Sequence, residues 1–355
     1  MIDFTLQLPT KIIFGKDAIA KLGGEASRCG KRALLVYGQG SIKRNGVYDE
    51  VITSLADSGI TIDEHAGVRE NPSLAHAEEG VRKAVRQKAE MIIAVGGGSV
   101  IDEGKGIAIG CVNQEPLWDF YTRKAEIKDA LPILAVQTMP ATSSETNFIS
   151  VLTNEKTRQK FSARSEKLFP RAAFLDPQKT LSIAADQTAC ACTDIMAHLM
   201  EGYLTSTDTY APVQDGIAEG IIKAVMGSME RLIGDPGDYN ARSAVMWAGA
   251  LAWSGLCSAG LGGASVPNHM LEHPLSALYD IRHGAGLSVI FPAWLSHGKD
   301  RHVRRIELFG KNVLGLPSGS GPEEITAALK SWYRKIGMPV TMKEAGIEEP
   351  DIPAM

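Results

Sequence analysis

The sequence predicts a two-part fold, in which an α/β domain with a mostly parallel sheet precedes an all-helical domain. At 355 residues the chain exceeds the usual size of a single hydrophobic core. Residues 33–176 alternate short β-branched runs with longer amphipathic runs, which is typical of parallel strands with helical crossovers. Beyond Asp176 the chain is rich in Ala, Met and Leu at helical spacing. We place the boundary at Pro177, so the predicted domains span residues 1–177 and 178–355.

Each element of the first domain follows from its own pattern. Short apolar runs bounded by turn residues predict strands, and runs with apolar residues at helical spacing predict helices. A hairpin-like segment runs through NFISVLTN and RQKFSAR. The expected strands are 33–38, 60–65, 91–95, 133–138 and 172–176, and the expected helices lie near 46–58, 74–88 and 100–110.

Composition excludes several classes of function. The formal net charge is −4, from 37 basic and 41 acidic residues without a long like-charge run, so neither a nucleic-acid stripe nor a polybasic membrane anchor is expected. No window approaches 18 uninterrupted apolar residues, the N-terminus lacks a signal pattern, and the five cysteines form no CxxC pair. We therefore expect a cytoplasmic protein with reduced thiols and a small-molecule partner. The oligomeric state stays open, with a homodimer as one candidate.

Four side chains in the second half form a candidate metal site. Asp194 and His198 are four residues apart in CTDIMAHLME, so they lie on one face of a predicted helix. His269 and His283 flank another helical stretch and can complete the set. Three imidazoles and one carboxylate suit Fe²⁺ or Zn²⁺, and the absence of cysteine indicates a catalytic ion rather than a structural one.

A glycine-rich turn in the first half predicts an anion site. The strand MIIAV runs directly into Gly96, Gly97, Gly98 and Ser99, which open a helix. Free backbone N–H groups and the positive end of the helix dipole favour a diphosphate there. The motif is neither GxGxxG nor GxxxxGK[ST], so hydrolysis of a nucleoside triphosphate is disfavoured.

Other turns should line the same edge of the sheet: Gly38 to Ser41, Asn71 with Pro72, and Thr138 to Thr142. No carboxylate occupies 38–41 to repel the 2′-phosphate of a nicotinamide cofactor. Ser41 can donate a hydrogen bond, and Lys43 and Arg44 add positive charge. These residues favour NADP(H) over NAD(H).

Eight motifs occur along the chain in this order: PTKIIFG, YGQGSIKRNGVYDEV, NPS, VGGGSVIDEGK, PATSSETN, FLDP, TDIMAHLMEGY and HMLEHPLSALYDIRHGAGLSVIFPAW. Together they resemble the iron-containing (group III) alcohol dehydrogenases, particularly the NADPH-dependent butanol dehydrogenase-like branch. The resemblance runs from residue 4 to about residue 350 and is specific, because the motifs contain several residues each and are correctly ordered.

This resemblance implies a dehydroquinate synthase-like fold and assigns roles to particular residues. The metal ligands would be Asp194, His198, His269 and His283, and His273 would be the non-ligand histidine near the nicotinamide. The implied dinucleotide contacts are Gly38, Gly40, Ser41, Asn71, Gly97, Gly98, Ser99, Asp102, Thr138, Thr142, Asn147 and Lys160. Two departures are Pro274, where some relatives have Glu, and the end of the chain at Met355, short of the final helical segment usual in the family.

The expected activity is a metal-dependent alcohol dehydrogenase or aldehyde reductase that transfers a hydride between NADP(H) and short-chain primary alcohols or aldehydes. Fe²⁺ is the expected ion and Zn²⁺ the alternative. Three other functions remain open at this point: an NAD-dependent polyol dehydrogenase of the glycerol type, a dehydroquinate synthase-like lyase, and a catalytically silent binding protein. The lyase is disfavoured because residues 186–206 contain no Lys or Arg to hold a phosphate and a carboxylate.

Overall fold

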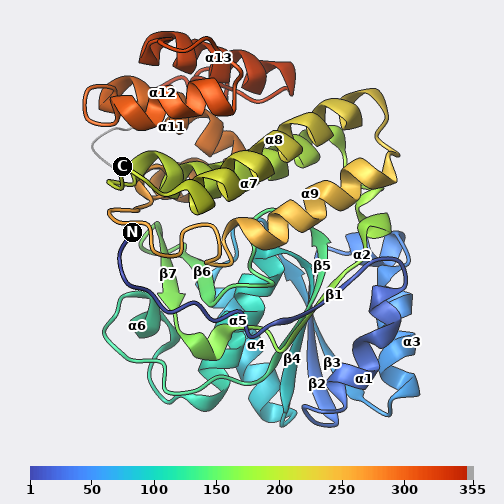
Figure 1. Ribbon diagram of the computed structural model, residues 1–355. Helices are drawn as coiled ribbons and strands as arrows, with labels where there is room; N and C mark the ends of the chain where they lie inside the picture. The colour runs from blue at the N-terminus through green and yellow to red at the C-terminus, as the bar shows by residue number, and fades with distance from the viewer. Residues whose placement is uncertain (350–355) are drawn as a thin grey trace. The chain divides into compact units, whose positions relative to one another are not determined.

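The structure, a computed structural model, describes residues 1–349 and forms two compact units (Figure 1). One unit is Leu8–Ser182, and the other combines Met1–Gln7 with the chain from Ile183 onward. The domain limits expected from the sequence, 1–177 and 178–355, stay predictions. Within the described residues, every helix is too short or too polar to cross a membrane.

The first unit, called here the sheet unit, contains every strand predicted from the sequence and one more, β1. Its strands are β1 (Lys11–Phe14), β2 (Arg32–Gly38), β3 (Thr61–Val68), β4 (Met91–Gly97), β5 (Ile133–Met139), β6 (Ile149–Asn154), β7 (Gln159–Arg164) and β8 (Ala172–Leu175). Its helices are η1 (Ala18–Lys21), α1 (Leu22–Ala26), α2 (Ser41–Arg44), α3 (Val47–Asp57), α4 (Leu74–Arg86), α5 (Gly98–Val112), α6 (Leu117–Tyr121), η2 (Glu166–Leu168) and η3 (Pro177–Thr180).

Six of these strands form one parallel sheet in the order β1-β8-β5-β4-β2-β3. The central strands are mainly apolar and almost fully buried, because helices cover both faces of a parallel sheet. Helices α1 and α3 pack on one face, and α4, α5 and α6 pack on the other (Figure 1). β6 and β7 form a separate antiparallel hairpin, as the sequence predicted.

Parallel strands all end at the same edge of the sheet, so the turns after β2, β3, β4 and β5 lie together. The neighbouring positions of these four strands follow directly from the strand order. This arrangement brings the predicted nucleotide-contact turns to one edge. β1 pairs with β8 and was not expected from the sequence, because a four-residue strand carries too little pattern to be recognised.

The second unit, called here the helical unit, contains only helices and loops among its described residues. Its helices are α7 (Ala185–Thr205), α8 (Pro212–Gly234), α9 (Tyr239–Ala252), α10 (Pro267–Tyr279), α11 (His283–Gly298), α12 (Val303–Asn312) and α13 (Pro322–Lys335). The prediction of an α/β domain followed by a helical domain is confirmed.

Helix α7 is the centre of the helical unit. From Thr188 onward every residue of this helix is buried, because α8, α9, α11 and α12 all pack against it. A helix that is buried on all sides has no solvent face and belongs in a core. The first residues of the chain join this unit through the Ile2 N–H, which donates to the Gly260 carbonyl at 2.9 Å.

Candidate metal centre and dinucleotide turn

Three helices of the helical unit bring the four predicted ligands together. Asp194 and His198 lie one turn apart on α7, His269 is in the first turn of α10, and His283 is the first residue of α11. The Oδ1 atom of Asp194 lies 3.5 Å from His198 Nδ1, 3.7 Å from His269 Nε2 and 3.8 Å from His283 Nε2.

These distances fit a shared divalent ion. Ligand atoms about 2.1 Å from a tetrahedral ion lie about 3.4 Å from one another. Asp194 Oδ1, His198 Nδ1 and His269 Nε2 are buried and have no hydrogen-bond partner. Orphaned polar atoms in a buried place are costly, and an ion between them would satisfy all three. The side chains present therefore fit the metal that the sequence predicts.

The charge states of Asp194 and His198 agree with this interpretation. Burial alone would raise the pKa of the Asp194 carboxyl, but His198, His269 and His283 outweigh burial and hold that pKa below its usual range. Burial lowers the pKa of His198 to about 3, so this imidazole is neutral at neutral pH and keeps a free lone pair. An ionised carboxylate and a neutral imidazole are the forms that bind a metal. His269 differs: burial would lower its pKa, but Asp194 and Glu201 outweigh burial and raise that pKa to about 9, so an ion would have to displace a proton there.

His273 lies beside the cluster. It follows His269 by one turn of α10, and its ring centroid is 5.9 Å from that of His283. Helix α10 continues through Pro274, one of the two departures from the family pattern. The sequence assigned five side chains to this site, one carboxylate and four imidazoles, and all five lie on α7, α10 or α11.

Two glutamates that the sequence analysis missed contact the same histidines. Glu201 accepts a hydrogen bond from His269 Nδ1 at 3.0 Å, and Glu272 is hydrogen-bonded to His283 Nδ1. Both glutamates are 0% exposed. The only sequence signal was proximity, because Glu201 follows His198 by three residues and Glu272 precedes His273.

The glycine turn of the sheet unit has the predicted form. β4 ends at Gly97 and α5 begins at Gly98, with no side chain capping the first turn of the helix. A Cβ at Gly98 would lie 2.2 Å from Thr142 Oγ1, so only glycine fits at this position. Ser99 donates from its hydroxyl to the Glu70 carbonyl, which ties this turn to the segment after β3.

The remaining predicted nucleotide contacts gather around this turn. Gly38, Gly40 and Ser41 follow β2, and Gly40 has a φ of 102°, which favours glycine. Lys160 on β7 donates to Asn71 Oδ1 at 3.1 Å. Thr138 lies near the end of β5 and Thr142 follows it, while Gly97, Gly98 and Ser99 lie between β4 and α5.

Two predicted contacts direct their polar atoms into the protein. The Asp102 carboxylate is buried and accepts hydrogen bonds from Ser144 Oγ and the Val151 N–H, and burial raises its pKa to about 6. The Asn147 side chain accepts from Lys105 Nζ at 3.0 Å and donates to the Thr142 carbonyl at 3.2 Å. In the structure, these two side chains hold the loop that follows β5.

The two cations that favoured NADP(H) differ in their surroundings. Lys43 Nζ lies 3.3 Å from Glu64 Oε2, and it lies over the rings of Tyr37 and Tyr48. Arg44 instead folds back over the turn, since a Cβ at Gly40 would lie 3.9 Å from its Nη1 atom. Arg44 is therefore the cation beside the turn, and Lys43 is held by a carboxylate.

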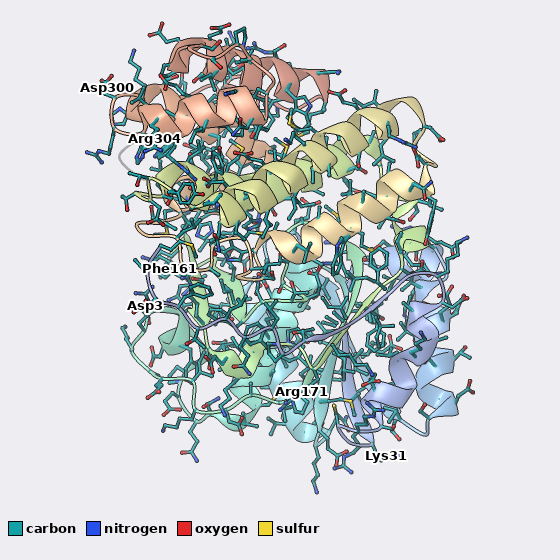
Figure 2. All side chains as sticks on the ribbon, viewed as in Figure 1. Asp3, Lys31, Phe161, Arg171, Asp300 and Arg304 are labelled. Atoms are coloured by element: carbon teal, nitrogen blue, oxygen red, sulfur yellow. The ribbon has the colours of Figure 1, made fainter. Side chains whose placement is uncertain are left out.

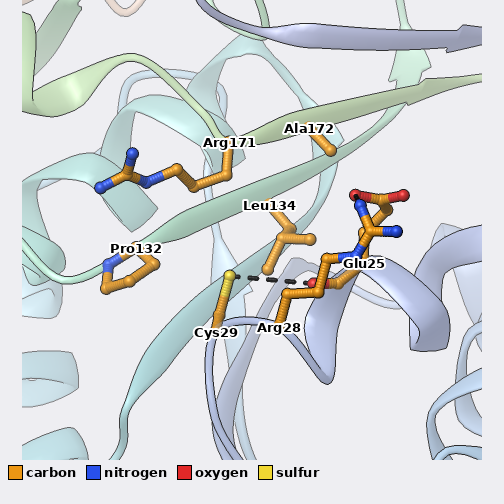
Figure 3. A pocket seen from close by; sticks show the side chains of 7 residues that line it. All are labelled: Glu25, Arg28, Cys29, Pro132, Leu134, Arg171 and Ala172. Carbon is orange, nitrogen blue, oxygen red and sulfur yellow. Dashed lines mark hydrogen bonds and ion pairs between the residues drawn. The ribbon is translucent and has the colours of Figure 1, made fainter.

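A pocket of about 370 Å³ lies at the opposite edge of the sheet, where β5 and β8 begin (Figure 3). Arg171, which Figure 2 also labels, lines it together with Arg28, Glu25 and Cys29. Burial raises the pKa of the Cys29 thiol, which favours its protonated and less reactive form. None of the residues predicted from the sequence lines this pocket.

Comparison with known proteins identifies the family. The model of the iron-containing alcohol dehydrogenases matches residues 9–177, and that of the C-terminal part of the Fe-containing alcohol dehydrogenase family matches residues 188–355. The chain is 36% identical to the probable NADH-dependent butanol dehydrogenase 1 of Bacillus subtilis, over 98% of this chain and 91% of that protein. It is 33% identical to the NADPH-dependent aldehyde reductase YqhD of Escherichia coli, over 100% of this chain and 92% of that protein.

A solved structure gives the same result. The crystal structure of the NADH-dependent butanol dehydrogenase A of Thermotoga maritima superimposes with a TM-score of 0.97 at 40% identity, covering 99% of this chain and 89% of that one. The chain therefore belongs to the iron-containing alcohol dehydrogenase family, a class of oxidoreductases that work with a divalent metal ion and a nicotinamide cofactor.

Proposed function

We propose that this protein is an aldehyde reductase and alcohol dehydrogenase that transfers a hydride between NADP(H) and short-chain primary alcohols or aldehydes. The observation that carries the proposal is the convergence of three histidine nitrogens, of His198, His269 and His283, on the Asp194 carboxylate. The names of the Bacillus and Escherichia relatives support the substrate class.

Each group of residues has a distinct task in this reaction. Asp194, His198, His269 and His283 would hold the divalent ion, which supplies Lewis acidity toward an alcohol or carbonyl oxygen. The backbone N–H groups at Gly98 and Ser99 would bind the diphosphate of the dinucleotide at the positive end of α5. His273 would give or take the proton, a contribution of about 10²- to 10⁴-fold.

Choice of NADP(H) rests on the turn after β2. No carboxylate lies between Gly38 and Ser41, and the Arg44 guanidinium lies beside Gly40. NAD(H) is the competing candidate, because the Bacillus relative and the butanol dehydrogenase B of Clostridium acetobutylicum, 37% identical to this chain, are both named NADH-dependent. A polyol, the alternative substrate, would be used with NAD(H) rather than NADP(H).

Fe²⁺ is the ion we propose, with Zn²⁺ as the alternative, because both accept three imidazoles and a carboxylate. The family name supports iron. The cytoplasmic location and the homodimer remain predictions from the sequence.

The test measures oxidation of NADPH and, in parallel, of NADH, with butanal as substrate. The protein is stripped with a chelator and reloaded anaerobically with either Fe²⁺ or Zn²⁺. We expect activity to vanish on stripping, to return with Fe²⁺, and to be higher with NADPH. Activity that survives complete stripping would refute a catalytic metal, and a higher kcat/KM with NADH would refute the cofactor choice alone.

A control variant separates the ion from the proton relay. His269→Ala removes a ligand and should nearly abolish turnover. His273→Ala should slow turnover by about 10²- to 10⁴-fold while the metal content stays unchanged. Wild-type turnover by the His269→Ala enzyme would contradict the assignment of this residue as a ligand.

A further inference from the structure

Two buried carboxylates contact the far sides of two candidate ligand rings. His269 has its Nε2 atom 3.7 Å from Asp194 Oδ1, while its Nδ1 atom lies 3.0 Å from Glu201 Oε1. His283 repeats this arrangement, with Nε2 3.8 Å from Asp194 Oδ1 and Nδ1 hydrogen-bonded to Glu272 Oε2. Each ring is therefore held between an inner carboxylate and an outer one.

This geometry selects one tautomer for each ring. A neutral imidazole carries one N–H, and a carboxylate that faces Nδ1 favours the tautomer with the hydrogen on that atom. The Nε2 atom then presents its lone pair to the centre of the cluster. Metal-binding histidines commonly have a carboxylate or carbonyl as the partner of their second nitrogen.

Other groups hold the two glutamates in place. Glu201 also accepts from the His269 backbone N–H at 2.9 Å and from Asn268 Nδ2 at 3.1 Å. Glu272 accepts from the Ser276 hydroxyl, one turn further along α10. A carboxylate with several fixed donors loses little further freedom when it orients a ring, so the orientation is established before the ion arrives.

His198 differs from the other two histidines. Its Nδ1 atom, rather than Nε2, faces Asp194 Oδ1 at 3.5 Å, and its ring packs against Trp253 at a centroid distance of 5.2 Å and against His269 at 4.6 Å. Packing holds this ring near Asp194 but does not select a tautomer. The carboxylates act on His269 and His283 alone.

We propose that Glu201 and Glu272 are positioning residues, which fix the Nδ1–H tautomers of His269 and His283 and thereby raise the affinity of the cluster for a divalent ion. The inference rests on the metal site in the proposed function. It adds that the three histidine ligands differ: carboxylates orient His269 and His283, whereas packing orients His198.

Equilibrium affinity for Zn²⁺ tests this proposal without relying on turnover. Zn²⁺ is titrated into the stripped full-length protein in competition with a chelating dye. Glu201→Met and Glu272→Met keep the approximate volume but remove the acceptor, so we expect each to bind Zn²⁺ about 10- to 100-fold more weakly. Glu201→Gln and Glu272→Gln can keep a carbonyl oxygen toward Nδ1, and they should bind close to wild type.

Asp215→Asn is the matched control. Asp215 is a largely buried carboxylate of the same unit, paired with Arg305 at 2.6 Å and without contact to a ligand histidine. We expect this variant to lose thermal stability while its Zn²⁺ affinity is unchanged. If the Met variants do not fold, Glu201→Asp and Glu272→Asp replace them, because the shorter side chain withdraws the acceptor from Nδ1.

The outcomes separate the inference from the function on which it rests. Wild-type affinity in the Met or Asp variants would overturn the positioning role, as would an equal loss of affinity in Asp215→Asn. Loss of affinity in the Gln variants equal to that in the Met variants would show that charge, rather than the acceptor, matters, and would also overturn it. Failure of the wild-type protein itself to bind Zn²⁺ or Fe²⁺ would instead remove the metal site.

Discussion

Lys43 and Arg44 are adjacent in the sequence, but their cationic groups have different neighbours. Lys43 is paired with Glu64, which also accepts hydrogen bonds from the hydroxyls of Tyr37 and Tyr48. Arg44 lies beside Gly40 in the turn after β2. A phosphate bound at this turn would therefore meet Arg44, whereas Lys43 would first have to leave Glu64.

Substitution of these two residues tests which one recognises the 2′-phosphate. A hydrogen bond to a charged group contributes about 1.5–3 kcal/mol, or about 10- to 100-fold in affinity. We expect Arg44→Ala to lower the ratio of kcat/KM for NADPH to that for NADH by this factor, and Lys43→Ala to leave the ratio unchanged. Affinities for 2′,5′-ADP and 5′-AMP, measured by calorimetry, should follow the same pattern. A fall in the ratio for Lys43→Ala alone would reverse the assignment.

At this scale the sequence predicted which residues carry chemistry but not all of their partners. The i, i+4 spacing of Asp194 and His198 is a local feature, so it was readable from the chain. The contact between Glu201 and His269 joins residues 68 positions apart, and therefore exists only after α7 and α10 pack together. The pairing of Lys43 with Glu64 has the same origin, since it depends on the register of β2 with β3.

At the scale of the element, the turn from β4 into α5 depends on a close approach that only glycine permits. A Cβ at Gly98 would lie 2.2 Å from Thr142 Oγ1 and 2.5 Å from its Cγ2. At Gly38 the nearest atom would be the Val68 carbonyl oxygen at 3.5 Å, which is an ordinary contact. The two glycines are therefore a matched pair that differ in the space around them.

We expect Gly98→Ala to destabilise the protein by about 1–3 kcal/mol, because overpacking forces α5 or the Thr142 loop to move. The same movement should weaken binding of NADPH, since the first N–H groups of α5 are the proposed diphosphate site. Gly38→Ala should change the free energy of unfolding much less. Urea unfolding and NADPH fluorescence titration measure the two effects, and equal stability losses in the two variants would contradict the packing argument.

Elements with long, regular patterns were predictable, and short ones were not. β4 begins with five consecutive apolar residues and β5 with four, and both runs are buried, so both strands were recognised. The helix predicted near 100–110 is observed as α5 over Gly98–Val112, because glycine at its start hides the helical pattern. Strand β1 and the three-residue helix η2 were missed, since each takes its form from neighbours rather than from its own residues.

At the scale of the whole molecule, the candidate metal ligands belong to one compact unit and the candidate dinucleotide contacts to the other. A ligand that binds only the folded state stabilises it by RT ln(1 + [L]/Kd), about 2.7 kcal/mol at 100 times Kd. The stabilisation acts on openings that break the binding site. Each ligand should therefore protect the backbone of its own unit.

Hydrogen exchange followed by mass spectrometry tests this separation. We expect Zn²⁺ added to stripped protein to slow exchange in α7, α10 and the start of α11, while peptides covering β2 and β4 keep their rates. The adenosine fragment 2′,5′-ADP, which lacks the nicotinamide, should instead slow exchange at residues 38–44, beside the turn after β2. Protection of 38–44 by Zn²⁺ alone would contradict the assignment of the two sites to separate units. Absence of protection in α7 and α10 would contradict the ligand set itself, because an ion bound to Asp194, His198 and His269 must hold these two helices together.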